Sequence, residues 1–104
     1  MNKYGAIKTE IDGHVFDSKR EAVRYSELKL AERAGEISDI VLQPEYLLRV
    51  EGGKSVGKYR ADFRYLHIPS DTVIVEDVKG VKTAVYRLKK RIVEAVYGIE
   101  IVEV

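Results

Sequence analysis

Asp62, Asp77 and Lys79 are residues of the types that metal-dependent cleavage of a phosphodiester bond requires. In that chemistry carboxylates hold a divalent cation, which polarises the phosphate and activates a water molecule. A neighbouring amine stabilises the negative charge that develops. Because side chains two residues apart on a strand share a face, Asp77 and Lys79 are expected on one side of a strand and Glu76 on the other.

A second predicted strand supplies Asp62. The pattern over residues 57–67 places Asp62 on one face with Arg60 and Arg64. The apolar residues of this segment alternate with them on the opposite face: Tyr59, Ala61, Phe63 and Tyr65. If this strand is the hairpin neighbour of the strand that ends at Asp77, the two carboxylates converge on one ion. An oxygen-only site of this kind suits Mg²⁺ or Mn²⁺ better than zinc.

The triplet acid-x-Lys is a weak signal by itself, because it occurs at residues 17–19, 27–29 and 77–79. Only the third triplet ends a β-branched run, follows a predicted hairpin that carries another aspartate, and precedes a basic helix. The context therefore favours residues 77–79 as the chemical site.

The N-terminal part of the chain predicts a hairpin and a helix. Asp12-Gly13 lies between two short β-prone runs, which is typical of a hairpin over residues 9–16. Ser18 and Glu21 have the spacing of a capping box, which begins a helix that runs to about Ala34.

The rest of the chain predicts three strands, a helix and a strand. The extended segments are 40–50, 57–67 and 72–79. From residue 83 to 97 apolar residues recur at helical spacings of three and four: Val85, Leu88, Ile92 and Val96. Gly98 ends this helix, and residues 99–104 read as the last strand. The order predicts one α/β domain over residues 1–104, a central mixed β-sheet flanked by helices.

The composition fits one small soluble domain. The chain has 104 residues, of which 45% are hydrophobic and 34% charged, as in ordinary globular proteins. It has no cysteine, which excludes disulfides, thiolate zinc sites and a cysteine nucleophile. No apolar run has the length of a signal-peptide core or a membrane span, so we expect a cytoplasmic protein without a membrane partner.

A basic cluster is hidden by the net charge of +1. Its members lie between residues 79 and 91: Lys79, Lys82, Arg87, Lys89, Lys90 and Arg91. Beyond Lys79, these side chains suit contacts with DNA phosphates, although a charged helix face is commonly only solvated. Lys89 either leans toward the catalytic end of the sheet or covers core methylenes with its aliphatic stem.

Two short motifs resemble those of a known superfamily. Arg60-Ala61-Asp62-Phe63 and Asp77-Val78-Lys79-Gly80, with fourteen residues between the two aspartates, are similar to motifs II and III of the PD-(D/E)xK nucleases. Ala61 stands where proline often precedes the first aspartate. The helix that begins after Phe16-Asp17-Ser18 resembles the motif I helix. The resemblance covers residues 4–104 and is closest to small phage-encoded nucleases related to endonuclease-I-type Holliday-junction resolvases.

The resemblance implies a restriction-endonuclease-like fold and a DNA endonuclease that leaves 5′-phosphate and 3′-hydroxyl ends. It implies that Asp62, Asp77 and the main-chain carbonyl of Val78 bind the metal. It further implies that Glu21 binds or positions the metal and that Lys79 assists the attacking water. The expected substrate is branched DNA in phage recombination or genome packaging, cut in the host cytoplasm. Since one small domain holds one site, symmetric cutting of two strands favours a homodimer.

Structural alternatives stay open for several of these residues. Glu21 is fully explained as a capping-box partner. Asp62 is also compatible with an exposed ion pair to Arg60 or Arg64, and Asp77 and Lys79 with solvated charges at a strand end. Gln43 either faces the polar end of the sheet and contacts the metal ligands without binding the metal itself, or is an ordinary strand residue before a proline.

Three other functions also stay open. The first is a nicking or transposition-type nuclease on linear DNA. The second is a copy of the fold that binds nucleic acid without cutting it, although such a binder has no need of paired acids beside a polyanion. The third is an interaction module unrelated to nucleic acid, which the near-neutral charge allows.

Overall fold

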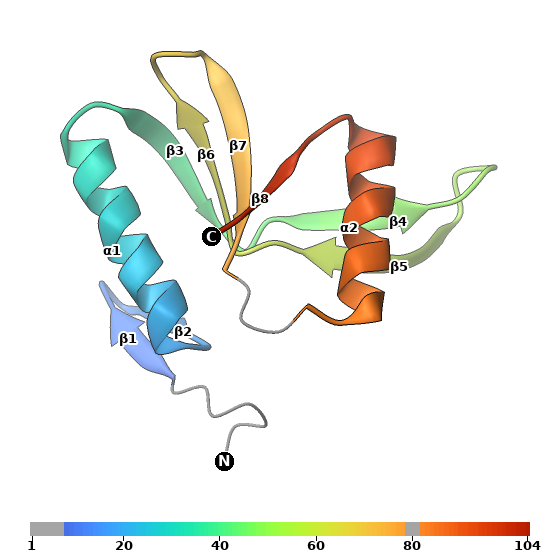
Figure 1. Ribbon diagram of the computed structural model, residues 1–104, viewed down its shortest axis with the longest axis horizontal. Coiled ribbons are helices and arrows are strands. Elements are labelled where there is room, and N and C mark those ends of the chain that lie inside the picture. The colour runs from blue at the N-terminus through green and yellow to red at the C-terminus, as the bar shows by residue number, and fades with distance from the viewer. Residues whose placement is uncertain (1–7, 79–81) are drawn as a thin grey trace.

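The computed structural model describes residues 8–78 and 82–104 (Figure 1). Two helices accompany a four-stranded sheet and two further hairpin pairings. In chain order the elements are β1 (Thr9–Ile11), β2 (His14–Phe16), α1 (Lys19–Arg33), β3 (Ile37–Leu42), β4 (Glu45–Arg49), β5 (Ser55–Arg60), β6 (Phe63–His67), β7 (Thr72–Asp77), α2 (Ala84–Tyr97) and β8 (Ile101–Glu103).

The central sheet is mixed. Its strand order is β3-β6-β7-β8, with antiparallel pairing as far as β7 and parallel pairing between β7 and β8. Parallel neighbours need a long connection, and α2 is part of the connection between β7 and β8. The predicted α/β class with a mixed sheet is confirmed. No helix of the described residues is long and apolar enough to cross a membrane.

The predicted N-terminal hairpin and both helices are confirmed. Asp12 and Gly13 have φ values of 52° and 79°, the left-handed conformation that a two-residue hairpin turn requires. Ser18 caps α1, since its hydroxyl accepts a hydrogen bond from the Glu21 N–H at 3.1 Å. Thr83 caps α2, and Gly98 ends that helix at a φ of 65°.

The prediction of three strands between the helices was wrong, because two of the predicted strands are each broken. Residues 40–50 divide into β3 and β4, and residues 57–67 divide into β5 and β6. Pro44 has no N–H to donate, and Gln43 before it has a φ of 51°, so the chain bends there.

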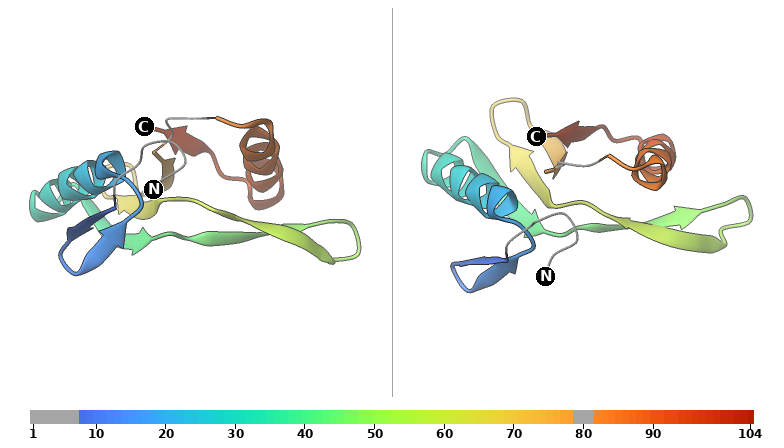
Figure 2. Two further views of the ribbon diagram at one scale, coloured as in Figure 1. Left: turned by 90° about the horizontal axis from the view of Figure 1, so that it is seen from below. Right: turned by 60° about the horizontal axis from the view of Figure 1, so that its bottom comes forward.

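The two breaks lie opposite each other. Across them the Gln43 N–H donates to the Asp62 carbonyl at 2.9 Å, and the Ala61 N–H donates to the Pro44 carbonyl at 3.0 Å. The pairing of β3 with β6 therefore continues into the pairing of β4 with β5. The β4–β5 ribbon extends away from the central sheet as an arm, and α2 packs along it (Figures 1 and 2).

The helices pack on opposite faces of the sheet at β7. Ile74 of β7 packs with the α1 cluster, whose buried members are Phe16, Ala22, Tyr25, Leu28, Ile37, Phe63 and Tyr65. Val75 packs with the α2 cluster, whose other buried members are Tyr46, Leu48, Tyr59, Ala61, Tyr86, Val93 and Ile101. Adjacent residues of β7 therefore serve different cores, as strand alternation requires.

Of the predicted apolar stripe of α2, Ile92 alone packs against the core. Val85, Leu88 and Val96 are exposed, at 63%, 58% and 50%. The buried residues of the helix are Tyr86 and Val93. The ring of Tyr86 packs beside that of Tyr59, and its hydroxyl donates to Glu103 at 2.8 Å, so burial and a hydrogen bond together set the rotation of α2.

Candidate active site

Asp62 lies at the bend between β5 and β6 and is half-buried. Its carboxylate Oδ2 accepts a hydrogen bond from the Val78 N–H at 2.7 Å, and its own N–H donates to the Glu76 carbonyl at 3.1 Å. The prediction that its strand neighbours the strand ending at Asp77 is confirmed, because β6 pairs with β7. The Asp62 carboxylate therefore lies at the end of β7.

Asp77 is the last residue of β7 and is fully buried, with an exposed fraction of 0%. The paired residues Phe63 and Glu76 both face α1. By strand alternation, Asp77 lies on the other face of the sheet. Asp62 lies in the bend before β6, and its carboxylate is placed by the bond from the Val78 N–H. The negative charge of Asp77 acts on Tyr86 of α2, whose pKa is raised by burial first, then by its hydrogen bond to Glu103 and by the charge of Asp77.

The donor set at this strand end fits a hard cation. Asp62 and Asp77 offer carboxylate oxygens from adjacent strands, and Val78 offers a main-chain carbonyl. Oxygen donors of this kind are the ligands that Mg²⁺ and Mn²⁺ prefer. The Asp77 carboxylate is completely buried, and a cation bound there would offset part of the cost of that burial.

Glu21 is buried in the first turn of α1, with 6% of its surface exposed. Ion pairs flank it on the same side of the helix. Asp17 precedes it by one turn and pairs with Arg60 at 3.8 Å, and Arg24 follows it by one turn and pairs with Glu76 at 2.7 Å. The start of α1 therefore lies over the region where β5 ends and β7 ends.

One of the two bonds of the predicted capping box is present, because the Ser18 hydroxyl accepts a hydrogen bond from the Glu21 N–H. That bond uses the main chain and leaves the carboxyl group in the interior. Among residues 8–78 and 82–104, no three His, Cys, Asp or Glu side chains form a group that could hold a metal ion. The structure thus brings Asp62 to the end of β7, with Glu21 in the adjacent helix and not in a formed cluster with both aspartates.

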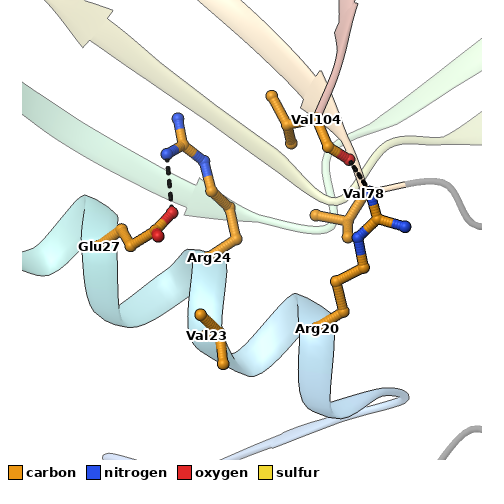
Figure 3. Close-up of a pocket in the computed structure, with 6 residues that line it drawn as sticks. All are labelled: Arg20, Val23, Arg24, Glu27, Val78 and Val104. Atoms are coloured by element: carbon orange, nitrogen blue, oxygen red, sulfur yellow. Dashed lines mark hydrogen bonds and ion pairs between the residues drawn. The ribbon is translucent and has the colours of Figure 1, made fainter.

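Lys79 lies outside the described residues, so its place beside Asp77 stays a prediction. Val78 is described, and its side chain is on the α1 side of the strand. There it lines a pocket with four residues of α1 and the residue that follows β8 (Figure 3): Arg20, Val23, Arg24, Glu27 and Val104. Arg20 donates to the Val104 carbonyl at 3.3 Å, which ties the start of α1 to the end of the sheet.

A buried network beside the aspartates was not predicted from the sequence. Glu76 is 1% exposed and accepts hydrogen bonds from Arg24 Nε at 2.8 Å and Nη2 at 2.7 Å. The Tyr65 hydroxyl donates to the same carboxylate. The bond to Glu76 raises the pKa of Arg24, and burial, with the bond to Glu76, raises the pKa of Tyr65 to about 12. The sequence signal that could have revealed this network is Glu76 within the apolar run of β7. A charged residue is almost never fully buried in such a run unless it is paired.

The predicted DNA-contacting residues divide into three groups. Lys82 and Lys90 pair with Glu103 of β8 at 3.2 and 3.7 Å. Lys89 donates to the Lys58 carbonyl of β5 at 3.3 Å, so its ammonium lies against the arm. Arg87 and Arg91 are exposed and one turn apart on α2.

Gln43 is not an ordinary strand residue, since it lies in the bend between β3 and β4 with a φ of 51°. Its N–H donates to the Asp62 carbonyl, so Gln43 contacts the main chain of a candidate metal ligand. Its side chain lines a second pocket, beside the N-terminal hairpin, with His14, Val15, Phe16 and Leu42.

Comparison with known proteins identifies the family. The family described as "Protein of unknown function (DUF1064)" matches residues 1–101, so the chain belongs to it. Neither the curated proteins nor the solved structures contain a significant match.

Proposed function

We propose that this member of the DUF1064 family is a Mg²⁺- or Mn²⁺-dependent DNA endonuclease of the PD-(D/E)xK type, with a restriction-endonuclease-like core. The observation that carries the proposal is the bond from the Val78 N–H to the Asp62 carboxylate. It brings a second acidic side chain to the peptide unit that follows Asp77. In the proposal the Asp77 carboxylate turns toward the same place, so that both acids hold one ion, as the activation of a phosphodiester requires.

In the proposed mechanism Asp62, Asp77 and the Val78 carbonyl hold the cation, with Glu21 as a further ligand or a positioning group. The cation supplies Lewis acidity and lowers the pKa of a coordinated water. The Val78 N–H restrains the rotation of the Asp62 carboxylate, so that one of its oxygens is already oriented. Lys79 orients the attacking water and stabilises charge on the phosphate.

The proposed substrate is branched DNA of the kind formed in phage recombination or packaging, cut in the cytoplasm of the host. Arg87 and Arg91 are the basic side chains of α2 that stand exposed for phosphate contacts. Symmetric cutting of two strands requires two sites, so we propose a two-fold homodimer. Sedimentation equilibrium would then give twice the 11.8 kDa of one chain.

The test is cleavage of a four-way junction, a Y-fork and a linear duplex, each with and without Mg²⁺ or Mn²⁺. Asp77→Asn removes the buried charge with little change of shape. Asp71→Asn is the matched control, because Asp71 is exposed in the turn between β6 and β7. Metal-dependent, junction-selective cleavage that is lost only in Asp77→Asn supports the proposal.

The other outcomes separate the alternatives. Cleavage of linear DNA alone favours a nicking or transposition-type nuclease. Binding without cleavage favours a non-catalytic copy of the fold. No binding at low ionic strength, where phosphate contacts are strongest, favours an interaction module.

A further inference from the structure

The Arg24–Glu76 ion pair joins the two elements that carry acidic candidate ligands. Arg24 lies one turn after Glu21 on α1, and Glu76 directly precedes Asp77 on β7. The contact is bidentate, with Nε and Nη2 of Arg24 each donating to one oxygen of Glu76, at 2.8 and 2.7 Å. A two-point contact between planar groups fixes orientation as well as distance.

Each partner of this pair is held by a further side chain. Arg24 Nη1 donates to Glu27 at 3.0 Å, and the Tyr65 hydroxyl of β6 donates to Glu76. The network therefore connects α1, β6 and β7. The Arg24 and Tyr65 donors reach the Glu76 carboxylate from the α1 side of the sheet, while Asp77 lies on the opposite side.

Stability alone does not account for this ion pair. The Arg24 side chain keeps 28% of its surface exposed, but Glu76 is buried. Taking that charge out of water offsets much of what the attraction returns, and well-packed apolar residues at such sites are often equally stable. Glu76 is 1% exposed and lies between Val75, which is also 1% exposed, and Asp77. What the pair supplies beyond an apolar contact is a fixed rotation and distance between helix and strand.

We infer that Arg24 and Glu76, supported by Tyr65, are positioning residues that set the place of Glu21 relative to Asp77. This inference rests on the proposed nuclease function. None of the three touches the cation or the substrate. They act on the two ligand-bearing elements, and through them on how well the site holds a cation.

The experiment replaces the network as a whole. The triple variant Arg24→Met/Tyr65→Phe/Glu76→Leu removes the charges and the hydroxyl together, so that no buried polar group loses its partner. The control Lys29→Gln/Glu32→Gln removes an ion pair of similar length, 2.7 Å, at the other end of α1. Calorimetry measures Mn²⁺ affinity, single-turnover assays measure cleavage, and thermal unfolding measures stability without metal.

We expect the triple variant to unfold cooperatively without metal, while its Mn²⁺ affinity and cleavage rate each fall about 10- to 100-fold, as for other residues that orient ligands. The control should match wild type in all three. Arg24→Lys keeps the charge and loses the two-point contact, so its Mn²⁺ affinity and cleavage rate should lie between those of the control and the triple variant. If the triple variant does not fold, Arg24→Lys decides the question.

Wild-type affinity and cleavage in the folded triple variant, or in Arg24→Lys where that variant decides, would overturn the inference and leave the proposed function intact. A wild-type protein that neither binds Mn²⁺ nor cleaves would instead overturn the proposed function, and the inference with it.

Discussion

The Asp77 side chain is the most deeply buried acid of the candidate site, with no exposed surface. A carboxylate in such a place is destabilising unless a cation or strong donors compensate it. A ligand that binds only the folded state raises stability by about 2.7 kcal/mol at 100 times its dissociation constant. If the cation binds at Asp77, the melting temperature must therefore depend on the cation.

We predict that saturating Mn²⁺ raises the melting temperature of the wild type by several degrees and leaves that of Asp77→Asn unchanged. Differential scanning calorimetry with and without Mn²⁺ measures both. Asp71→Asn, with its substitution in an exposed turn, should keep the full shift. An equal shift in Asp77→Asn would place the cation elsewhere.

Tyr65 gives the fold a sensitivity to alkaline pH. Burial, helped by the bond to Glu76, raises the pKa of its hydroxyl from 10.0 to about 12. A group with a raised pKa stabilises the folded state fully below its ordinary pKa and loses that contribution as the pH rises through the folded value. The contribution of Tyr65 is thus complete below pH 10 and declines between pH 10 and about 12.

We predict that Tyr65→Phe is less stable than wild type at pH 8 by about 1–2 kcal/mol, because a hydrogen bond to a charged group is lost. The difference should shrink steadily above pH 10, the ordinary value for the tyrosine hydroxyl. Urea unfolding from pH 8 to 11.5 measures it. A difference that does not change with pH would show that the hydroxyl does not titrate as argued.

At the scale of elements, the two opposed strand breaks determine where Asp62 lies. The bend at Gln43-Pro44 and the bend at Ala61-Asp62 are joined by hydrogen bonds of 2.9 and 3.0 Å. Together they bend the paired strands, so that the β3–β6 pair of the central sheet continues as the β4–β5 arm. Asp62 lies at that corner, where its side chain reaches the Val78 N–H.

Local patterns predicted these elements only where the cause is local. The turn at Asp12-Gly13 and the cap at Ser18 were confirmed, because each depends on neighbouring residues. The single apolar face predicted around Asp62 was wrong, since Tyr59 and Ala61 pack in the α2 cluster while Phe63 and Tyr65 pack in the α1 cluster. The pairing of Arg24 with Glu76 joins residues 52 positions apart, and no local pattern encodes it. The buried face of α2 was missed for the same reason, since Tyr59 and Glu103 select it from other strands.

Backbone strain at Gln43 provides a test at this scale. Its φ of 51° is unfavourable for most residues, and most of all for β-branched ones, while glycine adopts it freely. We predict that Gln43→Val lowers the free energy of unfolding by about 1–2 kcal/mol. Gln43→Gly should keep or raise it by up to about 1 kcal/mol. Urea midpoints measure both, and equal midpoints would contradict the bend.

At the scale of the whole molecule, fewer side chains of the basic cluster are available for phosphate contacts than the sequence indicates. Glu103 of β8 pairs with Lys82 and Lys90 and accepts the Tyr86 hydroxyl. That hydrogen bond is the main cause that lowers the pKa of Glu103, so its charge persists at neutral pH. If the protein binds DNA as proposed, the charge that α2 presents to it is therefore concentrated at Arg87 and Arg91, both exposed.

We predict that Arg87→Gln/Arg91→Gln weakens binding to junction and linear DNA alike, because both present the same phosphate groups and phosphate contacts carry no sequence information. The logarithm of the affinity falls linearly with the logarithm of the salt concentration, and each lost phosphate contact reduces the magnitude of this slope by about 0.9. The slope of the double variant should therefore be smaller in magnitude by about 2. Fluorescence anisotropy between 50 and 300 mM salt, roughly the range over which such contacts dominate, measures it.

The control Arg33→Gln/Lys54→Gln removes two exposed charges, at the end of α1 and in the loop of the arm. An equal loss in the control would mean that the attraction arises from net charge and that α2 does not lie on the DNA.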